Sequence, residues 1–429
     1  MRKRPLLLIT AALTATFVFG FEAHRRDLFP KLASRVAKRW HSPTERPAPK
    51  GRWGSAPKAK AGSAVDTPDL GALGYAPGTR LAGSESWVTV HDRSAAYAGF
   101  NVFTSGHAPE ALLTDMDGRV LHRWSITFEA AWPGRELKGR ADCWRRGHLF
   151  ENGDFIAMFD NLGLVKLDKA SRPLWAKAMN CHHDFEVLPD GRICVLTHEL
   201  APHPDLGKGK PIWNDAVALL GADGNVLESV PILDALESSS YAPILARLPD
   251  INDVLHTNTV EVFDGTRERF SPLFRAGNVL ISLRSIDTIA ILDMRTRRVE
   301  WALSGLWSKQ HDPTLLDNGH LLVFDNQGLG GESRVLEVDP FTQSVVWSYR
   351  GSEEHPFYSQ FCGVNRPLPN GNVLVIESEG GRAFEVTRDG RIVWEFYNPF
   401  LTGEQSELIA LIFDMVRLPP DFQIDWINR

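Results

Sequence analysis

The sequence predicts an all-β fold: a six-bladed β-propeller behind an N-terminal membrane anchor and a flexible linker. Three observations on the 429-residue chain lead to this prediction. Short β-branched runs are bounded by Asn-Gly, Asp-Gly and similar turns, a tryptophan recurs near the end of each repeated unit, and long helical patterns are scarce. One such unit cannot bury both of its faces, whereas units stacked in a ring can. A β-sandwich and a β-solenoid are the alternatives.

The bulk composition is that of a globular protein. Hydrophobic residues make up 43% of the chain and charged residues 23%, so there are enough apolar side chains for a large core. The net charge of −6 gives no reason to expect a nucleic-acid partner.

The N-terminus has the pattern of a signal-anchor or signal peptide over residues 1–22. A basic start, MRKR, precedes an uncharged apolar stretch at residues 5–21. That stretch has the length of a long signal peptide or a short membrane span. We expect residues 5–21 to anchor the chain to the inner membrane and the rest to be periplasmic, or otherwise extracytoplasmic. The pattern does not decide whether the anchor is cleaved.

Residues 23–68 are expected to form a basic flank and a disordered linker. The segment SPTERPAPKGRWGSAPKAKAGSAVDTP is rich in Pro, Ala, Lys, Gly and Ser and lacks the apolar side chains needed to pack. The propeller is expected to span residues 69–429.

Four units of the predicted propeller share one order: a turn glycine, an apolar strand, a second strand and a tryptophan. The tryptophan follows after 22, 24, 28 and 23 residues in the pairs Gly153–Trp175, Gly277–Trp301, Gly319–Trp347 and Gly371–Trp394. A partial unit ends at Trp124, and another, with the segment PDGRICVL, lacks the tryptophan. We expect the last stretch, FDMVRLPPDFQIDWI, to add a closing strand to the first blade, and residues 406–413 to form a short helix.

The four cysteines contain no CxxC pair, which argues against a zinc knuckle or a thioredoxin-like motif. An even number allows one or two disulfides in an oxidising compartment. Cys181 and Cys194 are candidates to face each other across a hairpin, although the spacing does not fix the pairing.

Two histidines occupy the same register in two units. His183 and His311 each lie eight residues before the turn glycine of their unit, Gly191 and Gly319. The strand nearest the axis of a propeller lines the central channel, so a residue just before it can point into the channel mouth. His256, which precedes a longer insertion, is the third candidate. One histidine at a turn is more often a solvated or capping residue, but three in comparable places predict a cluster.

Two arginines are candidates to join that cluster. Arg334 follows the glycines of GLGGESRV, whose flexible backbone can approach an anion, and Arg284 in SLRSID begins a strand-like segment. Histidine and arginine with few nearby carboxylates suit an oxyanion such as sulfate or phosphate, because the guanidinium offers a planar fork of donors. Histidine can also act as a nucleophile or a general acid–base.

A metal site is the rival interpretation. Suitable ligand atoms come from His182, His183, Asp184 and His256. An arginine in the same site would repel the cation, and no ligand spacing here is diagnostic. We therefore expect neither a metal ion nor a cofactor.

Several segments resemble the bacterial arylsulfotransferase family, especially one large branch of it. They are ALLTDMDGRVLHRW, HTNTV, QHDPTLLDNGHLLVFDN, SRV and LPNGNVLVIESEGGRAFEVTRDGRIVWE. The resemblance runs from Ala111 to the C-terminus and implies a six-bladed propeller in the periplasm. It also implies transfer of a sulfuryl group from a phenolic sulfate ester to a phenol, by a ping-pong route through a sulfated histidine and without a nucleotide donor.

The same resemblance implies roles for individual residues. His256, in a His-x-Asn element with Asn258, resembles the family's first active-site histidine, and His311 resembles the second. Arg334 resembles the sulfate-binding arginine. These three are the expected catalytic residues, and the expected substrate-binding residues are Asn258, His183, Arg284 and His355.

The sequence departs from the family pattern at one place. The histidine that carries the sulfuryl group in the family is expected in the next blade, where residues 361–363, about eight before Gly371, include no histidine. His355, His183 or Cys362 would have to take its place, or the transfer is lost. The alternative function is therefore a non-catalytic propeller that binds an anionic ligand, a glycan or a protein partner.

Overall fold

The computed structural model describes residues 77–137, 142–328 and 332–428. The predicted anchor at residues 5–21 and the predicted linker at residues 23–68 lie outside the described residues. Within the described part, no helix is both long and apolar enough to cross a membrane.

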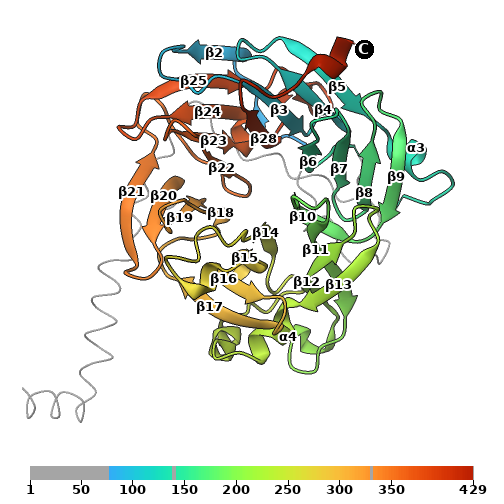
Figure 1. The fold of residues 1–429 in the computed structure, drawn as a ribbon, viewed down its shortest axis with the longest axis vertical. Coiled ribbons are helices and arrows are strands. Elements are labelled where there is room, and N and C mark those ends of the chain that lie inside the picture. Colours follow the sequence, from blue (N-terminus) through green and yellow to red (C-terminus); the bar gives the residue numbers. More distant parts are fainter. Residues whose placement is uncertain (1–76, 138–141, 329–331, 429) are drawn as a thin grey trace, which may run out of the picture. The chain divides into compact units, whose positions relative to one another are not determined.

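Six antiparallel sheets of four or five strands make up most of the described chain (Figure 1). The first contains β28 (Ile412–Leu418), β3 (Phe100–Ser105), β4 (Glu110–Thr114) and β5 (Val120–Ser125). The second contains β6 (Arg146–Leu149), β7 (Phe155–Phe159), β8 (Gly163–Leu167) and β9 (Pro173–Ala178). The third contains β10 (Cys181–Val187), β11 (Ile193–Ala201), β12 (Ile212–Leu220) and β13 (Val226–Pro231).

The other three sheets repeat the same plan. The fourth contains β14 (Thr257–Val262), β15 (Asn278–Leu283), β16 (Thr288–Asp293) and β17 (Arg298–Ser304). The fifth contains β18 (His311–Leu315), β19 (Leu321–Asp325), β20 (Arg334–Asp339) and β21 (Ser344–Arg350). The sixth contains β22 (Val364–Pro367), β23 (Val373–Glu377), β24 (Arg382–Val386), β25 (Ile392–Tyr397) and β2 (Trp87–His91).

Smaller elements connect the sheets. A three-stranded sheet contains β1 (Arg80–Leu81), β27 (Leu408–Ile409) and β26 (Leu401–Thr402). The α-helices among the described residues are α3 (Phe128–Ala131) and α4 (Ile232–Glu237), and the 3₁₀ turns are η2 (Gly207–Gly209), η3 (Ala242–Arg247), η4 (Pro272–Phe274), η5 (Arg284–Ile286), η6 (Ser378–Gly380) and η7 (Asp425–Asn428).

The innermost strands form a closed ring. Each of β6, β10, β14, β18, β22 and β28 contacts the next, and β28 contacts β6. Figure 1 shows these strands nearest the centre, with the other strands of each sheet outside them. The all-β prediction is confirmed, and the arrangement is that of a β-propeller.

Strands from both ends of the described chain close the ring. β28 pairs with β3, with Leu418 opposite Phe100, and so becomes the innermost strand of the first sheet. β2 pairs with β25 and becomes the outermost strand of the sixth sheet. The predicted closing strand is confirmed. The helix expected at residues 406–413 is wrong, because β27 and the start of β28 occupy them; a short buried apolar run does not distinguish a core strand from a helix.

The recurrent tryptophans lie on the fourth strand of five sheets: Trp124, Trp175, Trp301, Trp347 and Trp394. The indole nitrogen of Trp124 donates a hydrogen bond of 2.9 Å to the Gly153 carbonyl of the next sheet. The indoles of Trp347 and Trp394 make the same kind of bond to the sheet that follows theirs. The repeated tryptophan therefore joins one sheet to its neighbour.

The cysteines form no disulfide in the described part of the chain. Cys181 lies opposite Thr197 and Cys194 lies opposite Glu186 on the neighbouring strands β10 and β11, so the two do not face each other. The register of this hairpin rules out the pairing that the sequence left open.

Replacing Trp124 with alanine is expected to destabilise the protein by about 3–5 kcal/mol, since the fully buried indole would leave a cavity between two sheets. Trp347→Ala is the matched control, because it removes the same kind of hydrogen bond from a partly exposed indole and should cost at most about 2 kcal/mol. Urea unfolding measures both values. Equal losses would contradict the inference that burial between sheets gives these tryptophans their effect.

Candidate functional site

The structure brings His183 and His256 into direct contact. His183 lies in β10, and His256 immediately precedes β14. Their Nε2 atoms are 3.1 Å apart, and both side chains are buried. Two of the three histidines selected from the sequence thus meet at the innermost strands of neighbouring sheets.

A line of hydrogen bonds continues on both sides of this contact. On one side, Nδ1 of His256 bonds to a carboxylate oxygen of Asp253. On the other, Nδ1 of His183 lies 2.8 Å from Nδ1 of His182. Burial and then the charge of Arg145 hold the pKa of His183 well below its ordinary value, and burial lowers that of His182 to about 3. Both rings are therefore neutral at pH 7.

The backbone is bent where these histidines lie. His183 has a φ of 60° and His256 a φ of 49°, in the left-handed region that residues other than glycine rarely occupy. The pairing register shifts within β10 across His183, and within β14 just after His256. Bulges of this kind re-aim a side chain and are typical of functional sites.

His311 has a fixed tautomer. Its Nδ1 lies 2.7 Å from Oδ1 of Asn326 and 3.0 Å from the backbone oxygen of Lys309. The amide nitrogen of Asn326 donates to the backbone oxygens of Ser359 and Cys362, so the amide oxygen must face the ring. Nδ1 of His311 therefore carries the hydrogen. Its Nε2 is a buried lone pair with no hydrogen-bond partner in the described part of the chain.

His311 is also held in its neutral form. Burial and then the nearby charge of Arg284 lower its pKa well below the ordinary value. The bond to Asn326 opposes this shift without reversing it. A neutral imidazole with a free lone pair is competent as a nucleophile or a base.

Arg284 lies beside the histidines, as expected for a residue of the predicted cluster. It is the first residue of η5, and its backbone nitrogen donates to the His256 carbonyl at 3.3 Å. Its Nε is buried and has no hydrogen-bond partner among the described residues. A guanidinium placed in this way suits an anion.

Sequence reasoning missed Arg145, which immediately precedes β6. The charge of Arg145 lowers the pKa of both His183 and His311, and its side chain hydrogen-bonds to Cys362. Arg145 lies eight residues before Gly153, which is the same offset that selected the two histidines. The signal was therefore present in the sequence.

The other predicted site residues lie in different surroundings. Arg334 forms an ion pair with Asp325 of the same sheet, with 3.0 Å between Nε and Oδ2. Asn258 donates to the carbonyl of Gln310 at 2.9 Å and so ties its strand to the residue before His311. His355 is exposed on the loop between β21 and β22.

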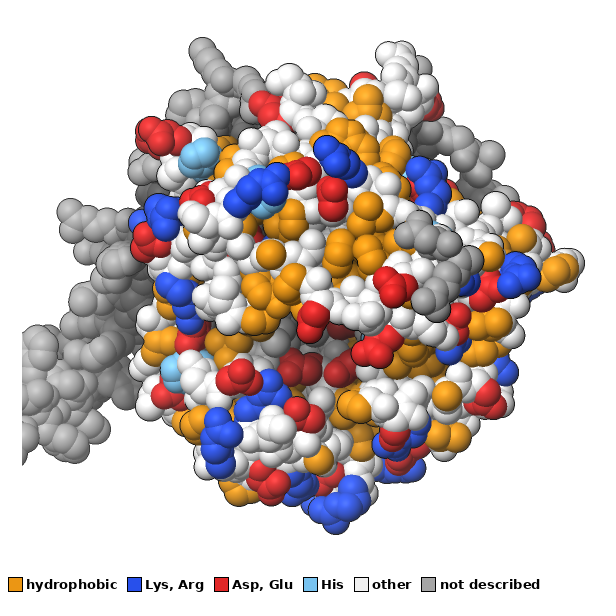
Figure 2. All heavy atoms as spheres, turned by 45° about the horizontal axis from the view of Figure 1, so that its top comes forward, with side chains coloured by type: hydrophobic (Ala, Val, Ile, Leu, Met, Phe, Trp, Pro, Cys, Tyr) orange, Lys and Arg blue, Asp and Glu red, His pale blue; other side chains and the backbone are white. Residues whose placement is uncertain are grey.

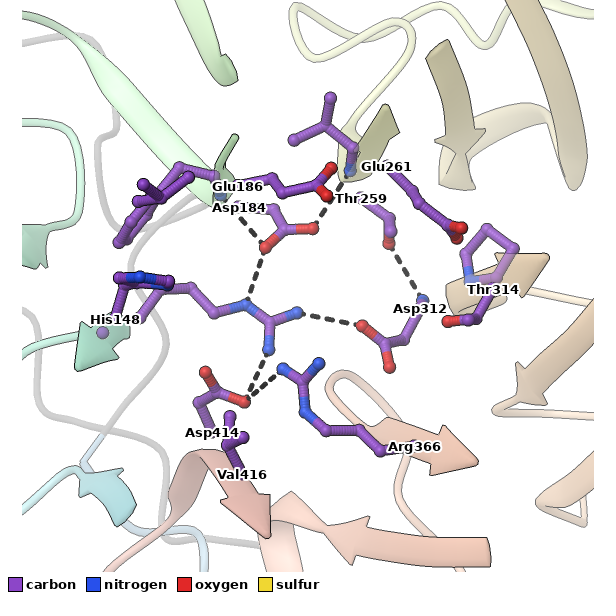
Figure 3. A pocket seen from close by; sticks show the side chains of 16 residues that line it. His148, Asp184, Glu186, Thr259, Glu261, Asp312, Thr314, Arg366, Asp414 and Val416 are labelled. Carbon is purple, nitrogen blue, oxygen red and sulfur yellow. Dashed lines mark hydrogen bonds and ion pairs between the residues drawn. The ribbon is translucent and has the colours of Figure 1, made fainter. Parts of the chain in front are cut away.

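A second feature of the innermost strands is an acidic cavity of about 420 Å³ (Figure 3). Arg146 forms ion pairs there with Asp184 at 3.0 Å, Asp312 at 3.2 Å and Asp414 at 3.0 Å. Figure 2 shows acidic side chains gathered at a hollow near the middle of the visible face. Because Asp184 points to Arg146 in this cavity, the rival metal set of His182, His183, Asp184 and His256 is not brought together.

Three carboxylates of this cavity are poorly compensated. Burial raises the pKa of Asp184 to about 6, that of Glu186 to about 7 and that of Glu261 to about 8. Some residues that line this cavity also share an offset in the sequence. Arg146, Asp184 and Asp312 each lie seven residues before a turn glycine.

The fold and the site define a class of protein: a β-propeller that gathers histidines and arginines from several sheets at its innermost strands. A sequence model of the family described as Arylsulfotransferase (ASST) matches residues 148–399, which is more than half of the chain. The chain belongs to the arylsulfotransferase family, as its motifs predicted.

Other comparisons give distant similarity. No curated protein matches the chain. A protein of unknown function from Bacteroides caccae is 13% identical over 74% of this chain and 98% of that chain, with a TM-score of 0.49. The WD40 β-propeller domain of Doa1 is 13% identical over 79% and 94%, with a TM-score of 0.41. The β-propeller domain of Cps50 (Swd1) from Myceliophteria thermophila is 12% identical over 78% and 97%, with a TM-score of 0.42.

Glu261→Gln is expected to stabilise the protein at high pH. The pKa of Glu261 is about 8 in the folded protein and 4.5 as a free side chain, so between these values the folded state holds a proton that the unfolded state releases. The contribution of Glu261 to stability therefore falls as the pH rises through this window. Glutamine stays neutral and can still accept the hydrogen bond from the Leu315 backbone.

We expect the variant to gain at least ~1 kcal/mol over the parent at pH 8 and nothing at pH 4. Urea unfolding of both proteins at the two pH values measures this difference. A gain of the same size at both pH values would show that Glu261 does not hold a proton in the folded state.

Proposed function

We propose that this protein is an arylsulfotransferase-like enzyme in which the six larger sheets are the blades of a six-bladed propeller. It would transfer a sulfuryl group from a phenolic sulfate ester to a phenolic acceptor. One observation carries the proposal: His311 presents a buried, unprotonated Nε2 within the electrostatic reach of Arg145 and Arg284. A neutral imidazole can attack sulfur, and guanidinium groups bind the oxygens of a sulfate ester.

In the first half-reaction, Nε2 of His311 attacks the sulfur of the ester. An N–S bond forms, the bond between sulfur and the phenolic oxygen breaks, and the phenolate leaves with the electron pair. Arg145 and Arg284 offset the negative charge of the sulfuryl oxygens. Asn326 continues to accept the hydrogen of Nδ1, which supports the positive charge that the sulfated ring acquires.

In the second half-reaction, the acceptor phenol attacks the sulfur and the N–S bond breaks. His256 takes the phenolic proton at Nε2, which exchanges its contact with His183 for the phenol. Asp253 next to Nδ1 of His256 stabilises the resulting imidazolium. Deprotonation of the acceptor is thus assigned to a different histidine from the one that carries the sulfuryl group.

In this assignment His311 carries the sulfuryl group, in place of the histidine that residues 361–363 lack. Cys362, the other candidate at that position, is less suited. Burial raises the pKa of its thiol, so the nucleophilic thiolate is scarce at neutral pH. His355 is exposed, outside the buried group of histidines.

We further propose that the enzyme works in the periplasm and that residues 5–21 hold it at the inner membrane. The support is the basic start followed by the apolar stretch of the N-terminus. Small phenolic sulfates and phenols are the proposed partners.

A second candidate function is non-catalytic binding of an anion by the same residues. The observation that favours it is the absence of a histidine from residues 361–363, the family's position for the sulfuryl carrier. In that case Arg145 and Arg284 would hold the ligand and no covalent adduct would form.

His311→Gln is expected to lower the rate of phenolate release from a chromogenic aryl sulfate by at least ~10³-fold, because it removes the proposed nucleophile. His355→Gln is the matched control and should leave the rate unchanged. In the parent, release should require added phenol beyond the first turnover. Peptide mass spectrometry after quenching without acceptor should find the sulfuryl adduct on His311.

An adduct on His256 or on Cys362 would refute the assignment of the carrier. A folded parent that releases no phenolate and forms no adduct, yet binds sulfate ions, would favour the binding propeller.

Asp253→Asn is expected to separate the two half-reactions. The first release of phenolate without acceptor should be nearly unchanged, whereas turnover with phenol should fall by ~10²-fold or more, since general-base help to the acceptor is weakened. Rapid-mixing and steady-state measurements on the same sample give both rates. Equal loss in both would show that Asp253 does not act through acceptor deprotonation.

A further inference from the structure

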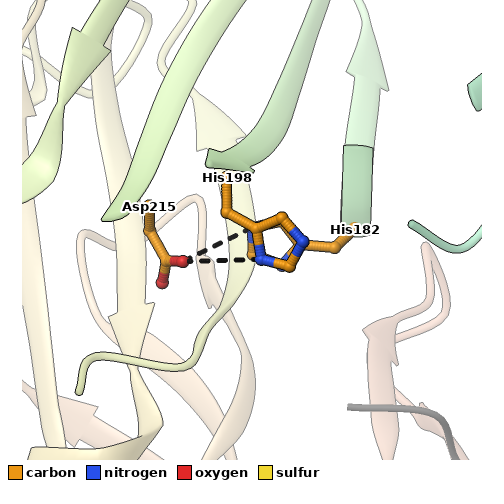
Figure 4. A group of neighbouring side chains, drawn as sticks. All are labelled: His182, His198 and Asp215. Carbon is orange, nitrogen blue, oxygen red and sulfur yellow. Dashed lines mark ion pairs between the residues drawn. The ribbon is translucent and has the colours of Figure 1, made fainter. Parts of the chain in front are cut away.

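Three polar side chains meet in the interior of the third sheet, beside the histidine pair but outside the proposed reaction. His182, His198 and Asp215 lie on the neighbouring strands β10, β11 and β12 (Figure 4). All three are at least nine-tenths buried. His198 lies directly opposite Asp215 in the strand register, which places both side chains on the same face of the sheet.

These side chains converge without bonding to one another. Oδ1 of Asp215 is 3.7 Å from Nε2 of His182 and 4.0 Å from Nδ1 of His198, and both distances are longer than a hydrogen bond. Oδ1 of Asp215, Nε2 of His182 and Nε2 of His198 are buried without a hydrogen-bond partner among the described residues. Orphaned buried polar atoms are rare, and three in one cluster indicate a missing component.

The hydrogen bonds through the neighbouring histidines show that the missing component must lie between two acceptor atoms. The proposed reaction needs His256 as a neutral ring, and a neutral His256 that donates from Nδ1 to the Asp253 carboxylate accepts at Nε2 from Nε2 of His183. Nδ1 of His183 must then accept from Nδ1 of His182. Every ring hydrogen in the line points toward Asp253. A neutral His182 is left with a lone pair on Nε2, which faces a carboxylate oxygen of Asp215.

Two acceptors that face each other in the interior need a cation or a hydrogen-bond donor between them. One oxygen of the Asp215 carboxylate accepts a hydrogen bond of 2.8 Å from the backbone nitrogen of Thr257, so Oδ1 alone is available to a ligand.

We infer that His182, His198 and Asp215 form a binding site for a divalent transition-metal ion of the zinc class. Two imidazole nitrogens and one carboxylate oxygen are a donor set that zinc prefers. Ligand atoms on a tetrahedral zinc ion with bonds of ~2.0–2.1 Å are ~3.4 Å apart, so the distances from Asp215 to His182 and His198 would shorten from 3.7 Å and 4.0 Å to about that value. A water molecule or substrate atom would complete the coordination.

Metal binding requires a small movement of His198. Its ring is stacked between His182 and Trp213, with centroid distances of 4.3 Å and 4.2 Å. The lone pair of an imidazole nitrogen lies in the ring plane, so the His198 ring must tilt out of this stack to share an ion with His182. The tilt changes the surroundings of Trp213 and provides a spectroscopic readout.

The ion would also act on the proposed reaction. An imidazole that binds a metal through one nitrogen donates from the other to an outer partner, and that partner orients it. Here the donor would be Nδ1 of His182 and the partner His183. The ion would thereby fix the direction of all the hydrogen bonds that reach His256.

The test uses the full, tag-free chain, stripped with a chelator and dialysed against Zn²⁺ or Co²⁺. We expect one equivalent of ion to remain bound after gel filtration, the absorption bands of tetrahedral Co²⁺ to appear, and Trp213-dependent fluorescence to change. His198→Gln and Asp215→Asn should each weaken ion binding by at least ~100-fold, because each removes a direct ligand. Loss of an outer partner already costs up to ~100-fold. His203→Gln, which alters a more exposed histidine near Glu237, is the matched control and should bind as the parent does.

Two results would overturn the inference. One is a folded parent that retains no ion. The other is equal ion binding by the parent and by Asp215→Asn. If Asp215→Asn raises the melting temperature and no ion binds, the group between the two acceptors is a proton on Asp215 rather than a metal. Because ion binding is measured without a sulfate ester, failure of the transferase assay leaves this test intact.

Discussion

A single buried guanidinium, that of Arg146, joins four sheets of the ring. It pairs with Asp184, Asp312 and Asp414, each from the innermost strand of a different sheet. Burial would lower the pKa of Arg146, but the three carboxylates outweigh burial and raise it above the ordinary value. Removing one member of such a network leaves a buried charge uncompensated, which costs about 3–5 kcal/mol. The positions of the innermost strands, and of everything attached to them, depend on this cation.

The innermost strands carry two chemical environments. Arg145, His183 and His311 each immediately precede a member of the network, but none of the three is among the residues that line the acidic cavity. His183 and His311 stay neutral through burial first, and then through the charge of Arg145 at His183 and of Arg284 at His311. The proposed anion-binding site and the acidic cavity can thus share the same strands.

The sequence predicted the parts of this arrangement that repeat. Turn glycines and tryptophans gave the sheets, and the eight-residue offset selected His183 and His311 correctly as residues of the innermost strands. The same offset holds for Arg145, which precedes Gly153 by eight residues. The pairing of Arg334 with Asp325 depends on how strands lie side by side, and a linear pattern does not show that. The cluster of His182, His198 and Asp215 likewise depends on the register of three strands, one of them bulged.

The surroundings that lower the pKa of His311 act differently on two processes at Nε2. They oppose protonation of this atom but do not oppose its proposed sulfation. Protonation adds a net positive charge to a buried ring near Arg145 and Arg284, and the surroundings oppose it. In the proposed reaction, sulfation would add a group whose negative charge balances the positive charge of the ring, so the adduct would be neutral overall. A site that rejects a proton can therefore accept a sulfuryl group. In the proposed enzyme the arginines supply the charge and the histidine supplies the lone pair, and the tautomer set by Asn326 keeps that lone pair on the nitrogen that faces the substrate.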